Sequence, residues 1–337
     1  MSADTVPPTP RPKTTGLHRV DPDAPADADI RPGVAKVDPI IVIDGVTRVF
    51  GGLTAVDVDH LEIPRNAITA LIGPNGAGKT TLFNLLTGFD KPNSGTWSFD
   101  GTNLAGIPAF KAARMGQVRT FQLTKSLGLL TVLENMKLGA THQTGEHLWA
   151  SILPFLWNGQ EKQNEEKARE LLKRFKLDAK EKDFAASLSG GQRKLLEMAR
   201  ALMSDPTLVM LDEPMAGVNP ALTQSLLDHI LDLKEMGMTV LFVEHDMHMV
   251  RHIADWVVVM AEGRVVAEGP PDTVMKNPAV IDAYLGAHQD VDLGVVTGRY
   301  AGELGADAAG LVEQAHEIDR AIVDDAERKE EETEDLT

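Results

Sequence analysis

The sequence contains no cysteine, so the protein cannot use disulfide bonds, a thiolate nucleophile or a cysteine-bound metal. It also lacks any apolar run of the roughly 20 residues that a membrane-spanning helix needs. The longest apolar stretches are 148–157, which Pro154 interrupts, and Trp256–Ala261. The first 15 residues have no apolar core behind their few basic residues, which excludes a secretory signal. We therefore expect a protein of a reducing compartment that does not cross a bilayer by itself.

A surplus of positive charge is absent as well. The 337 residues include 33 basic and 50 acidic side chains, which gives a formal net charge of −17. Most of the excess lies in residues 288–337, where 15 acidic residues accompany 4 basic ones. The rest of the chain is only mildly acidic. A nucleic-acid interface built on a large basic surface is therefore excluded, and we expect no nucleic-acid partner.

Three regions of the chain differ in composition. Residues 1–38 are rich in Pro, Asp and Ala without an apolar period, which predicts a flexible leader. Residues 39–286 form the folded unit, and 287–337 are predicted to be a mostly disordered acidic tail. Within that tail four apolar residues recur at helical spacing: Leu311, Ala315, Ile318 and Ile322. They indicate either a marginal helix or a helix that docks on this or another protein.

Apolar strands and helices alternate through the folded unit. The pattern predicts strands at 40–43, 60–63, 68–72, 95–100, 207–211, 239–243 and 257–260. The last three alternate with helices, which is typical of right-handed βαβ units in a parallel sheet. Helical periodicity dominates 125–186, and we assign an inserted helical subdomain to about 123–204. The predicted fold class is α/β.

A phosphate-binding motif follows the strand predicted at 68–72. Its residues match the pattern GxxxxGK[ST] and the position after it: Gly73, Pro74, Asn75, Gly76, Ala77, Gly78, Lys79, Thr80 and Thr81. Glycines let main-chain N–H groups surround phosphate oxygens, and the next helix adds the positive end of its dipole. We expect Lys79 to pair with the β- and γ-phosphates of ATP and Thr80 to place its hydroxyl on Mg²⁺.

Two adjacent carboxylates, Asp212 and Glu213, follow the apolar residues 208–211. Carboxylates beside a buried strand are costly to desolvate unless a cation or a reacting water uses them. We predict that Asp212 binds Mg²⁺ through its water shell and that Glu213 polarises the water that attacks ATP.

A third motif lies between the first two and opens a helix predicted at 193–203. After Leu188 it comprises Ser189, Gly190, Gly191 and Gln192. A serine and two glycines at a helix start make a second phosphate-binding terminus, although the first motif already holds one triphosphate. We therefore predict that this motif contacts the nucleotide of another copy in a dimer.

Together the three motifs resemble those of the ATP-binding cassette (ABC) ATPases. The resemblance implies a P-loop NTPase core with an antiparallel β subdomain and an inserted helical subdomain. It also implies that Gln122 contacts Mg²⁺ and acts in catalysis, that His245 reaches the γ-phosphate, and that Phe50 stacks on adenine. Asn219 stands where many of these proteins have aspartate. Taken singly, His245 and Phe50 would be ordinary surface or core residues.

Longer stretches resemble the ATP-binding subunits of bacterial branched-chain amino acid importers, the LivG type. They are residues 50–56, 118–122, 214–220, 243–247 and 277–286. That subgroup often has a tyrosine inside the third motif, which this chain lacks. Cassettes for urea, short amides and lipopolysaccharide export are similar. The apolar insert 148–157 either packs on the helical subdomain or contacts a membrane subunit or the bilayer.

The resemblance implies an ATPase subunit of an importer, attached peripherally to the cytoplasmic face of the cell membrane. Its partners would be transmembrane permease subunits, a second ATP-binding subunit of the same or a related sequence and, indirectly, an extracytoplasmic solute-binding protein. Two alternatives are the ATPase of a lipopolysaccharide-type exporter and a soluble cassette ATPase that acts on ribosomes, DNA or cofactor assembly. The single ATP site and the short helical lobe disfavour the ribosomal and DNA-repair types.

Overall fold

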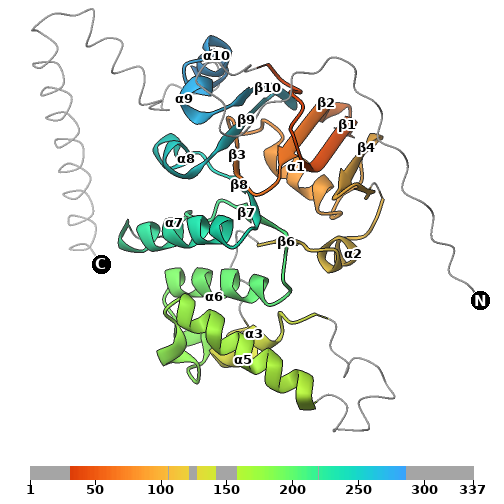
Figure 1. Ribbon diagram of the computed structural model, residues 1–337. Helices are drawn as coiled ribbons and strands as arrows, with labels where there is room; N and C mark the ends of the chain where they lie inside the picture. The colour runs from red at the N-terminus through yellow and green to blue at the C-terminus, as the bar shows by residue number, and fades with distance from the viewer. Residues whose placement is uncertain (1–30, 105, 121–126, 142–157, 219, 286–337) are drawn as a thin grey trace, which may run out of the picture. The chain divides into compact units, whose positions relative to one another are not determined.

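The computed structural model of the protein describes residues 31–104, 106–120, 127–141, 158–218 and 220–285. They form two β-sheets, the helices that connect the strands, and a group of helices inserted between two strands of one sheet (Figure 1). Within these ranges, no helix has the length and apolar character needed to span a bilayer. The expectations for Gln122, Asn219, 148–157 and 287–337 fall outside the described residues.

The first sheet is antiparallel. It contains β1 (Pro39–Phe50), β2 (Leu53–Pro64), β4 (Ser94–Phe99) and β5 (Thr102–Asn103), in the order β2-β1-β4-β5. β1 and β2 extend well beyond the strands expected at 40–43 and 60–63, because they pair as far as the turn at Gly51. Residues around that turn are exposed, so apolar periodicity does not reveal the pairing there. The antiparallel subdomain implied by the family resemblance is confirmed.

The second sheet has six strands in the order β10-β9-β3-β8-β7-β6. They are β3 (Ile68–Ile72), β6 (Gln117–Arg119), β7 (Leu208–Asp212), β8 (Thr239–Val243), β9 (Trp256–Ala261) and β10 (Arg264–Gly269). Neighbouring strands run parallel from β9 to β6, and β10 pairs antiparallel with β9. The expected parallel sheet is confirmed. β6 and β10 are additional, since neither carries the continuous apolar run of β3, β7 and β8.

Three helices follow parallel strands: α1 (Lys79–Leu86) after β3, α7 (Pro220–Glu235) after β7 and α8 (Met247–Ile253) after β8. α2 (Ala109–Arg114) precedes β6, and α9 (Pro271–Val274) and α10 (Pro278–Leu285) follow the antiparallel β10. α8 begins where it does because Asp246 caps it, accepting hydrogen bonds from two main-chain N–H groups of its first turn. Because β3, β7 and β8 are parallel, the loops that leave their carboxyl ends lie at one edge of the sheet.

The main hydrophobic cluster joins the two sheets through α1. It includes large side chains from β1, α1, β4, β7 and β9: Ile41, Phe83, Trp97, Met210 and Val258. Fully burying a side chain of this size contributes about 2 kcal/mol. α1 therefore has one side in the core, and its amino terminus points out of the core at the edge of the parallel sheet.

The inserted group consists of α3 (Val132–Lys137), α5 (Asn158–Arg174) and α6 (Gly190–Leu202), which contact one another (Figure 1). Thr131 and Glu134 cap each other's main-chain N–H groups at the start of α3. A second capping box starts α6 at Gly190, three residues before the expected start, because a serine cap lets glycine enter the first turn.

The amino-terminal boundary of the folded unit differs from the expected one. Val34, Ala35 and Lys36 are buried, although they belong to the segment expected as a flexible leader. The Nζ atom of Lys36 lies 2.7 Å from Oε2 of the fully buried Glu268. The same carboxylate accepts a hydrogen bond from the indole of Trp256 at 3.0 Å. The prediction of a leader to residue 38 is therefore wrong for these residues, whose tertiary ion pair has no local sequence pattern.

Candidate nucleotide site

The glycine-rich motif forms a tight loop between β3 and α1. Gly73 has φ 149° and Gly78 has φ 96°, conformations that residues with a side chain rarely adopt. A Cβ atom on Gly73 would lie 2.1 Å from the carbonyl oxygen of Met260, and one on Gly78 would lie 2.2 Å from that of Ala55. The loop therefore packs main chain against main chain, and only glycine fits at both positions.

The amino terminus of α1 fits a phosphate group. Gly78 precedes the helix, no side chain caps its N–H groups, and its first turn contains no acidic residue. Thr80 lies exposed in that turn, and Asn75 and Gly76 are exposed at the tip of the loop. Open N–H groups at the positive end of a helix dipole bind anions, and a glycine loop adds further main-chain donors.

Lys79 is half-buried at the centre of this loop. Its Nζ donates hydrogen bonds to the carbonyl oxygens of Gly73 at 2.6 Å and Pro74 at 2.9 Å. Burial lowers the pKa of Lys79, while the carboxylates of Glu213 and Asp212 act in the opposite direction. The structure thus brings the expected lysine and the expected pair of carboxylates together, from β7 and from the loop after β3.

Asp212 ends β7 and is held by a residue that the sequence analysis did not single out. Nη2 of Arg119, the last residue of β6, lies 2.6 Å from Oδ2 of Asp212. Another nitrogen of the same guanidinium donates to Oδ1 of Asn84 on α1 at 2.7 Å. Arg119 lies within the stretch 118–122 that carried part of the family resemblance, but no local rule indicates its partner.

Glu213 leaves the strand in an unusual conformation. Its φ is 45°, in the left-handed region, and its main-chain N–H donates to the carbonyl oxygen of Val243 at 3.0 Å. Such conformations cost about 1–3 kcal/mol and persist where the surrounding structure holds them. The side chain is partly exposed next to Asp212. A turned, partly exposed carboxylate beside the phosphate loop is suited to orienting a water molecule.

The loop after β8 places the buried Glu244 next to the exposed His245. His245 is 69% exposed, and its Nδ1 lies 3.7 Å from Oε2 of Glu244. Glu244 is 1% exposed and accepts a hydrogen bond from the N–H of Met215 at 3.1 Å. Burial raises the pKa of Glu244, and the main-chain N–H groups of Met215 and His245 oppose that shift. The sequence analysis used Glu244 only as part of a motif.

The third motif lies at the start of α6. Ser189 Oγ accepts from the N–H of Gln192 at 3.3 Å, and Oε1 of Gln192 accepts from the N–H of Ser189 at 3.0 Å. Gly191 is buried and packs against Leu222 of α7, whereas Ser189 and Gly190 are exposed. The described contacts of this motif thus cap its own helix and leave its first residues on the surface.

Phe50 ends β1 with 46% of its surface exposed. The guanidinium of Arg48 lies 4.3 Å from the centroid of its ring, a cation–π distance. Two nitrogen atoms of the Arg48 guanidinium, Nε and Nη2, each lie 2.8 Å from a carboxylate oxygen of Asp90. The ring is therefore held in place and keeps exposed surface on which a planar ligand can stack. Gln122 and Asn219 are not among the described residues.

Two family models match the chain. One, described as ABC transporter, matches residues 56–216, and the other, described as branched-chain amino acid ATP-binding cassette transporter, matches residues 264–290. A probable branched-chain amino acid transport ATP-binding protein LivG of Archaeoglobus fulgidus is 40% identical over 257 residues, which cover 76% of this chain and 99% of that protein. A high-affinity branched-chain amino acid transport ATP-binding protein BraF of Pseudomonas aeruginosa is 41% identical over 254 residues, covering 74% and 98%.

Solved structures agree with these sequence matches. The ADP conformation of an ATP-binding cassette of an ABC transporter is 36% identical, has a TM-score of 0.65, and covers 74% of this chain and 99% of its own. A nucleotide-free cassette from an ABC transporter is 35% identical with a TM-score of 0.64, covering 73% of this chain and 98% of its own. Each similarity spans nearly the whole relative.

Proposed function

The chain belongs to the ABC transporter family as one of its ATP-binding and ATP-hydrolysing subunits, and from this we propose that it powers the import of branched-chain amino acids. The relatives named for branched-chain amino acid transport share about 40% of its residues. The match at residues 264–290, to a model described for branched-chain transporters, supports the same substrate class independently of the shared ATPase motifs.

The loop geometry supports the roles proposed for several ATP-binding residues. The phosphates bind at the start of α1, where Lys79 exchanges its two carbonyl partners for phosphate oxygens and Thr80 and Thr81 lie in the first turn. The exposed ring of Phe50 stacks on adenine, and its pairing with Arg48 keeps it in place. The single observation that carries the assignment is the half-buried Lys79 bonded inside a glycine loop at a helix start that no side chain caps.

The oxygen donors near α1 fit Mg²⁺. Thr80 offers a hydroxyl and Asp212 a carboxylate, and Mg²⁺ prefers such ligands together with water and phosphate oxygens. Gln122 completes the proposed set from outside the described residues. When bound, the ion would neutralise charge on the phosphate oxygens. Glu213 orients and polarises the attacking water, and His245, exposed at the end of β8, contacts the γ-phosphate.

Hydrolysis is proposed to take place between two copies, or between this chain and a related subunit. Ser189 and Gly190 are exposed at the start of α6, so the amino terminus of this helix can contact a ligand outside its own chain. ATP would then lie between the P-loop of one subunit and this motif of the other. Closing and reopening of that interface would move permease subunits, with the assembly attached to the cytoplasmic face of the membrane.

Two measurements test the proposal. Expressed with its own permeases and solute-binding protein in a strain that lacks these genes, the chain should drive ATP-dependent uptake of leucine, isoleucine or valine. Glu213→Gln should abolish that uptake because it removes the carboxylate that polarises water while keeping its shape. Uptake that is inhibited only by urea or short amides would contradict branched-chain amino acids as the substrate class. If the strain that lacks these genes has lost only the export of an envelope lipid, the chain is favoured as a subunit of an exporter.

A further inference from the structure

The loop that follows β7 is tied to three other parts of the fold. The N–H of Glu213 donates to Val243 O of β8, and the N–H of Met215 donates to the carboxylate of Glu244 at 3.1 Å. The third tie comes from the helical subdomain. Nζ of Lys194 on α6 donates to Pro214 O at 2.9 Å and also to Ala216 O. The main-chain groups of the loop that take part in these bonds all belong to the four consecutive residues 213–216.

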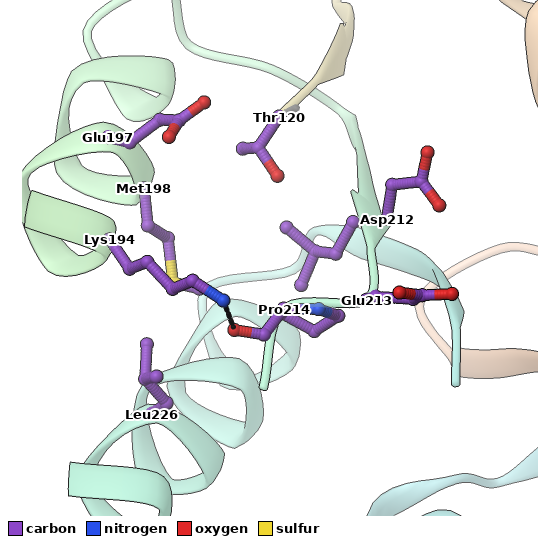
Figure 2. A pocket seen from close by; sticks show the side chains of 9 residues that line it. Thr120, Lys194, Glu197, Met198, Asp212, Glu213, Pro214 and Leu226 are labelled. Atoms are coloured by element: carbon purple, nitrogen blue, oxygen red, sulfur yellow. Dashed lines mark hydrogen bonds between the residues drawn. The ribbon is translucent and has the colours of Figure 1, made fainter. Parts of the chain in front are cut away.

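Lys194 is suited to hold this loop rather than to react. Figure 2 shows its side chain reaching from α6 to Pro214, while the carboxylate of Glu213 points away on the other side of the loop. Thr120, Glu197, Met198 and Leu226 are among the other residues that line the same small pocket. Burial lowers the pKa of Lys194, and the carboxylates of Glu244, Glu197 and Glu213 oppose that shift.

The conformation of Glu213 gives these ties their importance. A φ of 45° is unfavourable for a residue with a side chain, so the peptide after β7 relaxes unless its neighbours hold it. Lys194 bonds the carbonyl group of the next residue, Pro214, and that of Ala216. It therefore restrains the segment directly after Glu213.

We propose that Lys194 is a positioning residue for Glu213: through the carbonyl oxygens of Pro214 and Ala216, it links α6, which begins at Ser189, to the loop that orients the attacking water. The inference rests on the proposed role of Glu213 in ATP hydrolysis. Within one chain, Lys194 connects the first turns of α6 after Ser189 to the loop that carries this carboxylate.

The test is the steady-state ATPase of Lys194→Met, which keeps much of the side-chain volume and removes the donor. We expect kcat to fall about 10- to 100-fold, as it does when a group that orients a reacting residue is lost. The KM for ATP and equilibrium binding of a fluorescent ATP analogue should stay nearly unchanged, since Lys79 and the P-loop are untouched. Lys194→Arg keeps charge and donors and should recover most of kcat.

Lys173→Met supplies the matched control, because Lys173 is an exposed lysine of α5 in the same subdomain. A second readout is hydrogen exchange of the peptide that covers 213–218, which should be faster in Lys194→Met than in wild type and the control. This readout needs only folded protein, which thermal melting checks. If Lys194→Met does not fold, Lys194→Gln, which keeps a shorter donor, takes its place in both measurements.

The outcomes separate the inference from the proposed function. Wild-type protein without ATPase activity would overturn the proposed function. An active wild type whose Lys194 variant folds, binds ATP and keeps its kcat would overturn only the positioning role. Equal loss of kcat and of nucleotide affinity would also overturn it, because Lys194 would then act on the whole site and not on Glu213. Unchanged exchange at 213–218 would overturn it as well, because Lys194 would then not restrain this loop.

Discussion

Nη2 of Arg119 lies 2.6 Å from Oδ2 of Asp212, and their side chains are 7% and 6% exposed. The two residues come from neighbouring parallel strands, β6 and β7, and are 93 residues apart in the sequence. The guanidinium compensates a carboxylate charge that water cannot reach at the end of β7. The proposed Mg²⁺ ligand is thus held by a cation on the adjacent strand.

Replacing Arg119 with methionine should destabilise the protein strongly. Removing one partner of a buried pair leaves an uncompensated charge and typically costs about 3–5 kcal/mol. The measurement is the free energy of unfolding in urea. Arg264→Met is the control, since Arg264 pairs with Asp57 at the surface and such pairs are worth about 0–1 kcal/mol. Equal effects of the two substitutions would contradict the assignment of Arg119 to a buried pair.

Lys79→Ala should abolish ATP hydrolysis and weaken nucleotide binding while the protein stays folded. The substitution removes the charge that meets the phosphates, but in the unliganded chain it breaks only two hydrogen bonds to carbonyl groups, each worth about 1 kcal/mol. ATPase rate, nucleotide binding and thermal melting should be measured together. Lys111→Ala, an exposed lysine of α2, should leave all three unchanged. Hydrolysis that survives in Lys79→Ala would rule out the P-loop assignment.

Ser189→Arg should block ATP-dependent dimerisation without preventing ATP from binding to the P-loop of the same chain. Ser189 is exposed and its hydroxyl caps only its own helix, so a bulky cation there obstructs a second subunit. Gel filtration with saturating ATP should show Glu213→Gln as a dimer and Ser189→Arg as a monomer. A Glu213→Gln protein that stays monomeric counts against dimerisation of the isolated chain.

Mixing these two variants tests whether the motif acts across the interface. In a mixed dimer one nucleotide site carries both substitutions and the other carries neither. ATPase activity should therefore reappear on mixing if one intact site is sufficient. Mixing each variant with itself is the control and should give no activity. Strong activity of Ser189→Arg alone would show that the motif is not needed at the site.

The buried Lys36 should make residues 33–36 necessary for stability and residues 1–30 dispensable. Lys36→Met leaves Glu268 buried without its cation, which should cost about 3–5 kcal/mol of unfolding free energy. Deleting 1–36 should lower the melting temperature in the same way, whereas deleting 1–30 should change neither melting nor ATPase activity. Lys276→Met, at an exposed lysine, is the control. A stable protein that starts at residue 37 would contradict this prediction.

His60 should contribute stability that decreases at alkaline pH. Glu62, 3.4 Å from its Nε2, and Asp44, 2.7 Å from its Nδ1, raise the pKa of His60 to about 9. Because the pKa of His60 is higher in the folded state than in the unfolded state, where it is about 6.5, its contribution to stability is complete below that pH. The contribution is lost as the pH rises through 9. The unfolding free energies of wild type and His60→Gln should differ by about 1 kcal/mol at pH 6 and converge by pH 10.

The exposed His252 offers the comparison for that pH series. His252→Gln removes a histidine at the surface, and its unfolding free energy is measured at the same pH values as a control. A difference between wild type and His60→Gln that grows with pH would contradict the direction of the pKa shift.

The sequence by itself determined four parallel strands of the second sheet, β3, β7, β8 and β9, and the positions of the phosphate loop and of Glu213. These features depend on contiguous residues. Residues 73–80 can form a phosphate loop because glycines at fixed positions allow main-chain conformations that other residues rarely adopt. The run 208–211 is apolar because both faces of a central strand are covered. Apolar periodicity and the positions of the glycines can therefore be recognised from the sequence alone.

Only the tertiary structure decided which charged side chains meet. Lys36 and Glu268 are 232 residues apart, and Lys194 and Pro214 are joined across two elements of the fold. A sequence does not indicate whether an ionisable side chain is buried or which group it pairs with. In the sequence, Arg119 and Glu244 therefore cannot be told from ordinary polar residues. Burial removes water as an alternative partner, and each such charge then requires one particular group that the packing of distant strands and helices supplies.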